Sequence, residues 1–206
     1  MNKLLSVSAL TLIAAAAPAM AQDVTITNAR VVIGDGSEPI EGGTVVVQAG
    51  KVVYAGPEKA AANGAPTIDA KGAYVTPGIF ATVTTLGLSD VSAVSETEDS
   101  RAAASPFSAA LDAAAAINPV SQHILVHRAA GITRAATATA PTGSIFAGQG
   151  AIIDLDGDAK PVVQARAFQM VDLGENGARL AGGSRPAAHA LLRAALREAQ
   201  ALAGKT

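Results

Sequence analysis

Hydrophobic and polar residues alternate over short stretches in the first third of the chain. β-Branched residues dominate these stretches and turn-forming residues separate them, as in "VTITNARVVIGDG", "GTVVVQAGKVVYAG" and "TIDAKGAYVTPG". Alternation with a period of two between turn residues is typical of half-buried strands joined by tight turns. Residues 22–76 are therefore predicted to form a small domain built on an antiparallel sheet.

The pattern changes after the Pro-Gly pair at positions 77 and 78. The run "IFATVTTLGL" is continuously apolar and rich in β-branched residues, so it predicts a strand buried on both faces. Helical and strand patterns then follow one another along the chain. Helices are expected over residues 106–116, 118–131 and 162–171, strands over residues 132–140 and 151–158, and a loop over residues 141–150.

The last predicted element is a long amphipathic helix that follows Ser184. Pro186 would occupy its first turn and Gly204 would end it. Strands that alternate with helices favour a parallel α/β unit, so residues 77–206 are predicted to form a second domain of that class. One face of the last helix carries apolar side chains, namely Leu191, Leu192, Ala195, Leu196, Ala199 and Leu202.

The first 22 residues, "MNKLLSVSALTLIAAAAPAMAQ", have the features of a secretory signal. A basic residue precedes an apolar run, Pro18 interrupts the run, and Ala-Met-Ala then matches the small-x-small pattern that signal peptidase accepts. A transmembrane anchor is the alternative, but the run is shorter than the roughly 20 residues that a span needs. We expect a signal peptide at residues 1–21, no stable membrane anchor after its cleavage, and a periplasmic or secreted protein that starts at Gln22.

Composition narrows the classes of partner and chemistry. The 206 residues include 15 Lys and Arg against 17 Asp and Glu, for a net charge of −2, without a long block of either sign. Such a chain lacks the basic footprint that nucleic acids require, so no nucleic-acid partner is expected. The sequence has no cysteine, which excludes disulfides, thiolate nucleophiles and Cys-ligated zinc.

Several ordered segments resemble one known family. "TITNARVVIGDGSEPIEGGTVVVQAGKVVYAGP" and "IDAKGAYVTPGI" resemble the N-terminal part of the amidohydrolase superfamily and are most similar to its imidazolonepropionase-like branch; "AAGITRAATA" and "GQGAIIDLDG" also resemble family segments. The resemblance implies a small composite β-sandwich beside a (β/α)8 barrel that hydrolyses non-peptide carbon–nitrogen bonds with zinc or another divalent metal.

The length of the second domain modifies that expectation. A closed barrel takes ~250 residues, which residues 77–206 cannot supply. The expected fold is therefore mixed β and α/β: a small antiparallel β-sandwich-like domain followed by an incomplete (β/α) TIM-barrel-type unit.

The metal-binding motif of the family is altered in this chain. In the family, the first barrel strand carries Pro-Gly-Leu-Ile-Asp-x-His-x-His, and both histidines bind metal. Here Ala81 stands at the aspartate position, and Val83 and Thr85 stand at the two histidine positions. Valine has no lone pair to donate, and a neutral threonine hydroxyl is a poor zinc ligand. We therefore expect no metal, no cofactor and no catalytic residue in this chain.

A histidine pair elsewhere could in principle rebuild a site. His123 and His127 are spaced i, i+4 on a predicted helix, which lets two imidazoles reach one metal ion. Ile124 stands where the His-Glu-x-x-His motif has its glutamate, and no third ligand is identifiable. We expect both histidines to line a helix flank or to cap a neighbouring loop. His189 stands alone and is expected on the surface of the last helix.

Other candidate groups favour structural roles. The sequence "DLDGD" begins like a calcium loop but has Ala159 and Ala165 where glycine and glutamate are needed, so it predicts a turn after a strand. Three carboxylates before residue 100 are typical of a solvated loop, and two serines lack the Gly-x-Ser-x-Gly frame of a nucleophile. These candidates are Asp154, Asp156, Asp158, Glu96, Glu98, Asp99, Ser144 and Ser184.

Two classes of function remain open. The first is an exported amidohydrolase-family hydrolase of which this chain is a truncated N-terminal part, inactive on its own. The second is a non-catalytic relative, either a binding or interaction module or a degenerate gene product. An incomplete barrel would leave a strand edge and the leucine face of the last helix uncovered. The chain is therefore expected to self-associate, to pair with a complementary fragment, or to stay partly molten with exposed hydrophobic surface.

Overall fold

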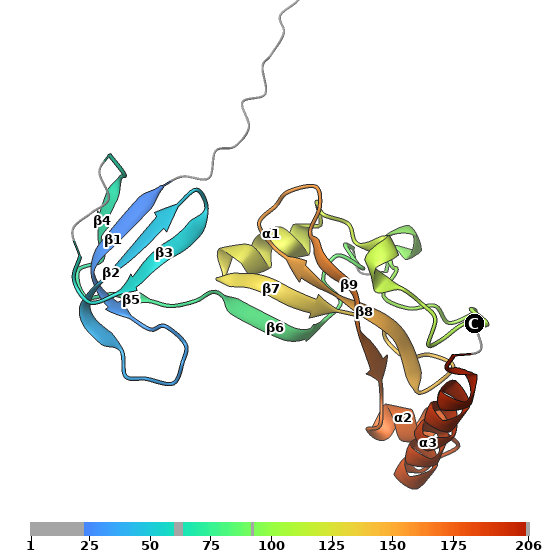
Figure 1. The fold of residues 1–206 in the computed structure, drawn as a ribbon. Helices are drawn as coiled ribbons and strands as arrows, with labels where there is room; N and C mark the ends of the chain where they lie inside the picture. Colours follow the sequence, from blue (N-terminus) through green and yellow to red (C-terminus); the bar gives the residue numbers. More distant parts are fainter. Residues whose placement is uncertain (1–22, 60–63, 92, 205–206) are drawn as a thin grey trace, which may run out of the picture. The chain divides into compact units, whose positions relative to one another are not determined.

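The computed structural model describes residues 23–59, 64–91 and 93–204 (Figure 1). These residues form two compact units, of which the first ends at Pro77 and the second begins at Gly78. The predicted signal peptide lies outside the described residues. Among the helices that the structure describes, none is long and apolar enough to cross a membrane.

The first unit is a mixed β-sheet. Its strands are β1 (Val24–Val31), β2 (Ile40–Gln48), β3 (Lys51–Gly56), β4 (Thr67–Asp69) and β5 (Tyr74–Val75). Strands β1, β2 and β3 are antiparallel neighbours, whereas β4 and β5 pair parallel to β1. The antiparallel prediction is thus correct for β1 to β3 and wrong for β4 and β5, because the chain leaves β3 at one edge and returns on the far side of β1. The described strands form one sheet where a sandwich-like arrangement was expected.

The second unit is built on four strands that lie side by side in chain order. Strands β6 (Ile79–Thr84) and β7 (Ile132–Thr137) are parallel, and α1 (Gln122–Ala129) lies between them in sequence. Strands β8 (Phe146–Asp154) and β9 (Val162–Val171) then continue the sheet in antiparallel order. The described part of this unit therefore has one parallel crossover, not the succession of βα units expected of a partial barrel.

The remaining described elements of the second unit are three short helical segments and one long helix, α3 (Arg185–Leu202). The short segments are the 3-10 helices η1 (Ser95–Thr97) and η2 (Ala113–Ala116), and the helix α2 (Glu175–Leu180).

The core of the second unit lies between α1 and the sheet. Its buried side chains are Leu86, Ile124, Ala135, Ile153 and Leu155. They come from α1, from β7 and β8, and from the residues that directly follow β6 and β8. The predicted helix over residues 118–131 and the predicted strand over residues 132–140 are confirmed, with shorter bounds in each case.

Two predicted helices are wrong. Residues 162–171 form β9, since their backbone pairs with β8 along its length. A ten-residue segment of mixed apolar and polar residues fits a strand as well as a helix, and the neighbouring strand decides between them. Of residues 106–116, only the last four are helical, because the Asp112 carboxylate accepts a hydrogen bond from Ala114 N at 3.0 Å and so starts a helical turn there.

Strand β6 exists as predicted but is not buried. It lies at the edge of the sheet, where Ile79, Phe80 and Val83 are 57%, 44% and 72% exposed. The continuous apolar run had predicted a strand covered on both faces. Among the described residues, β6 has a strand neighbour on one side, β7.

The long amphipathic helix is confirmed as α3. Ser184 caps it by accepting a hydrogen bond from Ala187 N at 3.3 Å, and Pro186 lies in its first turn. Ala188 is buried, and the helix packs on α2, as Figure 1 shows at the red end of the chain. Several leucines of the predicted apolar face remain exposed, namely Leu191, Leu196 and Leu202.

Candidate functional site

The carboxyl ends of β6 and β7 lie side by side at one end of the sheet. Three hydrogen bonds hold these ends together: Thr84 Oγ1 donates to Ala136 O at 3.0 Å, Thr137 Oγ1 donates to Leu86 O at 2.9 Å, and Ala138 N donates to Thr84 O at 3.1 Å. The carboxyl ends of parallel strands are where α/β proteins place their ligand sites. This end of the sheet is therefore the expected place for a ligand site.

A cavity of 260 Å³ opens at the end of β6. It brings together Val83 and Thr85, which the sequence resemblance aligned with two histidines of the amidohydrolase superfamily, and the i, i+4 histidine pair of α1. Its lining is Val83, Thr84, Thr85, Leu86, Ser89, His123 and His127.

Both histidines are already hydrogen bonded to backbone carbonyls. His123 Nε2 lies 3.0 Å from Asp90 O, and His127 Nδ1 lies 2.7 Å from His123 O. Because a carbonyl oxygen only accepts, each of these ring nitrogens carries the proton. The other ring nitrogen, Nδ1 on His123 and Nε2 on His127, makes no hydrogen bond among the described residues. The expectation that the pair caps a neighbouring loop is met for His123, which holds the loop at Asp90.

The donor set of this cavity does not fit a divalent metal. Val83 offers no lone pair, and Thr85 offers a neutral hydroxyl. In residues 23–59, 64–91 and 93–204, no three His, Asp or Glu side chains lie close enough together to hold a metal ion. Zinc in a catalytic site takes three protein ligands, and the histidine pair supplies two at most.

A second cavity, of 320 Å³, adjoins the first along the end of β6. The two share Val83, Thr84 and Thr85. The other lining residues of the second cavity are apolar or carry hydroxyl groups, namely Ala138, Thr139, Ala140, Pro141 and Met170. The two cavities at the carboxyl end of β6 can therefore receive a small molecule through apolar contacts and hydroxyl hydrogen bonds.

The acidic sequence after β8 lies at the opposite end of the sheet from the carboxyl ends of β6 and β7. Since β8 runs antiparallel to β7, with Arg134 opposite Asp154, its end lies at the start of β7. Asp156 Oδ1 accepts from Asp158 N at 2.9 Å and Asp158 Oδ1 accepts from Lys160 N at 2.6 Å, which is turn geometry. Burial, together with the charge of Asp156, raises the pKa of Asp154.

The other sequence candidates also hold local structure. Glu98 accepts hydrogen bonds from the hydroxyls of Ser89 and Ser100, and the bonds from Ser100 lower the pKa of its carboxyl group. Ser144 Oγ accepts from Phe146 N at 3.2 Å, and Ser184 caps α3. His189 is exposed on α3, as expected.

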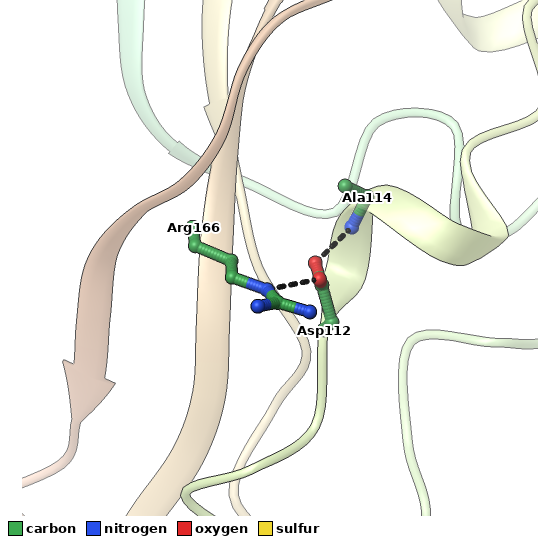
Figure 2. A network of polar contacts seen from close by, with 3 residues as sticks. All are labelled: Asp112, Ala114 and Arg166. Atoms are coloured by element: carbon green, nitrogen blue, oxygen red, sulfur yellow. Dashed lines mark hydrogen bonds and ion pairs between the residues drawn. The ribbon is translucent and has the colours of Figure 1, made fainter. Parts of the chain in front are cut away.

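Sequence reasoning missed an ion pair between Asp112 and Arg166 (Figure 2). Arg166 Nε donates to Asp112 Oδ2 at 2.8 Å, and this bond lowers the pKa of the Asp112 carboxyl group. Asp112 also caps η2 through Ala114 N. The pair thus fixes η2 against β9. Asp112 before an alanine run was a readable capping signal, but nothing in the sequence linked it to Arg166.

Comparison with protein-family models and with curated proteins finds no match. Among solved structures, an amidohydrolase from Thermotoga maritima MSB8 is similar over 88% of this chain, with a TM-score of 0.71 and 22% sequence identity. A molinate hydrolase matches 33% of this chain and 15% of its own length, with a TM-score of 0.30 and 22% identity, which is too little to support an argument. This chain spans 49% of the length of the Thermotoga protein. The chain therefore shares the fold of about half of an amidohydrolase.

Proposed function

We propose that this chain is a member of the amidohydrolase superfamily, of its imidazolonepropionase-like branch, that binds small molecules without hydrolysing them on its own. The observation that carries this proposal is the lining of the 260 Å³ cavity, where Val83 and Thr85 occupy the places of the family's two histidines. The cavity persists at the carboxyl ends of β6 and β7, whereas the donors for a metal do not.

The chemistry of amide hydrolysis explains why these donors matter. A bound metal lowers the pKa of its water and polarises the carbonyl group of the substrate, so hydroxide can attack at neutral pH. With two imidazoles and three hydroxyl groups, the cavity offers neither a metal site nor a paired acid and base. It does offer hydrogen-bond donors and acceptors beside apolar walls, which is the composition of a binding site.

Hydrolysis in a complex with a second polypeptide is the other candidate function. Two observations favour it: β6 is an uncovered edge strand with exposed Ile79 and Phe80, and the similar amidohydrolase has about twice the length of this chain. A complementary fragment that pairs with β6 would cover this edge and could add metal ligands. Under this second candidate function, the chain is an incomplete (β/α) barrel that gains the ability to hydrolyse non-peptide carbon–nitrogen bonds when it assembles with the second polypeptide.

Hydrolysis assays with purified protein test the main proposal. The protein would be supplied with zinc and a panel of amides, lactams and N-acyl amino acids, beside the double variant Val83→His/Thr85→His. We expect neither protein to exceed the buffer rate. The wild-type histidine pair gives zinc two ligands at most, and the double variant, which adds imidazoles beside that pair, still has no carboxylate in the cavity to act as a general base. Zinc-dependent turnover by the wild-type chain, lost in His127→Ala, would overturn the proposal.

Export is the second part of the proposal. The leader at residues 1–21 supports a periplasmic or secreted protein. The intact mass of protein from a periplasmic fraction should correspond to a chain that starts at Gln22. Recovery of the full-length chain from the membrane fraction would contradict cleavage.

A further inference from the structure

A third cavity in the second unit has a different chemistry from the two at the end of β6. It has a volume of 440 Å³ and carries two guanidinium groups, an amide and a hydroxyl group. It shares Ala140 and Pro141 with the 320 Å³ cavity, so the two adjoin. Its lining is Arg101, Ala140, Pro141, Thr142, Asn176 and Arg179.

A backbone hydrogen bond places Arg101 at this cavity. Ser100 O accepts from Ala140 N at 2.7 Å, which fixes the loop before Arg101 beside the residues that follow β7. The charge of Arg101 acts on the Glu98 carboxyl group, but the structure shows no ion pair between them, and that carboxylate accepts hydrogen bonds from Ser100 and Ser89. Among the described residues, the guanidinium group of Arg101 makes no hydrogen bond and no ion pair, so its donors are free for another acceptor.

A chain of side-chain contacts places Arg179. Its Nη2 donates to Asn176 Oδ1, and Asn176 Nδ2 donates in turn to Asp172 Oδ2 at 3.1 Å. Asp172 N donates to Ile145 O at 2.9 Å, which ties α2 to the segment that leads into β8. One edge of the guanidinium group is thus held in place. Its Nε and Nη1 remain to bind a ligand.

The balance of charge in this cavity favours an anion. Of the six lining residues, two are cationic and none is acidic. The ion pairs that the structure shows within the second unit use Arg166 and Arg185, not Arg101 or Arg179. Two guanidinium groups that face one cavity repel each other, and a shared anion relieves that repulsion while it accepts charge-assisted hydrogen bonds.

We propose that Arg101 and Arg179 bind the carboxylate of a small organic anion, whose apolar part extends into the adjoining cavity toward Met170 and Val83. A guanidinium group matches the planar carboxylate with paired donors. The neighbouring apolar and hydroxyl lining selects an organic acid over an inorganic ion, because an inorganic ion leaves that cavity unfilled. This inference adds a class of ligand to the proposed binding function. It rests on that function only for the claim that the 320 Å³ cavity receives the apolar part of the ligand.

Calorimetric titration with isovalerate tests the proposal. Its neutral isostere isovaleramide and inorganic phosphate serve as comparison ligands. Arg101→Gln and Arg179→Gln should each weaken isovalerate binding by about tenfold, since each removes a charged hydrogen-bond donor. Arg193→Gln, which removes an exposed charge on α3, should leave the affinity unchanged. Arg179→Lys keeps the charge and should bind with an affinity between those of the wild type and Arg179→Gln.

The outcomes separate this inference from the proposed function. Isovalerate contains no hydrolysable bond, so its binding is independent of any hydrolase activity. Wild-type protein that does not bind isovalerate, equal affinity for isovaleramide, or equal binding by correctly folded Arg101→Gln and Arg179→Gln would overturn the assignment. Phosphate that binds as tightly as isovalerate would overturn the organic part of it. A thermal unfolding transition like that of the wild type confirms that each variant is folded.

Discussion

Strands β6 and β8 have similar sequences and opposite environments. Both are rich in apolar and small residues, as "IFATVT" and "FAGQGAIID" show. Strand β8 lies between two neighbours and buries Ala147, Ala151 and Ile153. In the part of the chain that the structure describes, β6 pairs with β7 alone and exposes most of its side chains. An apolar run therefore predicts that a strand forms, but the number of neighbouring strands decides whether it is buried.

The largest expected effect comes from truncating one side chain in each environment. Ile153 is fully buried in the cluster around Ile124 and Leu155. Ile153→Ala should cost about 2–5 kcal/mol of unfolding free energy, because it removes buried methyl groups and leaves a cavity. Val83→Ala, on the exposed strand, should cost less than ~0.5 kcal/mol. Urea unfolding monitored by circular dichroism measures both, and a similar loss in the two variants would show that β6 is covered in solution.

Amide exchange should show the same contrast without a substitution. Strand β8 has hydrogen-bonded strands on both of its sides, β7 and β9. One side of β6 has no partner strand among the described residues. We expect protection of β8 to exceed that of β6 by about tenfold or more. Equal protection through Ile79 to Thr84 would mean that another segment or another copy of the chain pairs with β6.

A charge on the exposed edge should reduce self-association. Ile79→Lys places a cation on β6, where it opposes pairing with a second strand edge. Val163→Lys on β9 is the matched control, since β9 is the opposite edge and its pairing with β8 is already irregular. Light scattering after size exclusion should show a smaller mass for Ile79→Lys than for wild type and no change for the control. A wild-type chain that is already a compact monomer would contradict the expected self-association.

Removing the charge of Asp112 and removing that of Asp154 should change the stability by smaller amounts and in opposite directions. The pKa of Asp112 is lowered by Arg166, so Asp112 stabilises the fold at neutral pH, and that stability is lost as the pH falls through the lowered pKa. Asp112→Ala should therefore cost about 1 kcal/mol at pH 7, mainly through the lost cap on η2, and less as the pH falls below the usual pKa range of an aspartate.

Asp154 should behave in the opposite way. Burial raises its pKa, so the ionised form destabilises the fold at neutral pH, and the penalty disappears as the pH falls through the raised pKa. Asp154→Asn should raise stability at pH 7 by on the order of 1 kcal/mol and change little below pH ~4. Thermal unfolding across this range measures both variants, and destabilisation by Asp154→Asn at pH 7 would contradict the role of burial.

Much of the fold was readable from local signals. Turn residues and β-branched runs gave β1 to β3, β6, β7 and the second half of β8, and the cap at Ser184 with Pro186 gave the start of α3. The first half of β8, residues 146–150, was wrongly expected to be a loop. The errors came where partners distant in sequence decide the outcome. The segment 162–171 became a strand because β8 lies beside it, and β4 and β5 turned parallel because the chain crosses the sheet before them.

The candidate site was readable only in part. The resemblance located Val83 and Thr85, and helical spacing paired His123 with His127, but only the fold shows that all four line one cavity. The pairing of Arg101 with Arg179 left no signal in the sequence, since 77 intervening positions separate them and a loop and a short helix bring them together. Side chains that meet through tertiary structure need the structure to be found.

Equilibrium dialysis against zinc tests the central claim most directly. The mature protein and His123→Ala/His127→Ala would be dialysed together, and the retained zinc measured by elemental analysis. The account predicts the same substoichiometric amount in both, because Val83 and Thr85 leave the histidine pair without further ligands. About one tightly held zinc ion per wild-type chain, absent from the variant, would contradict it and show that the histidines have rebuilt a metal site.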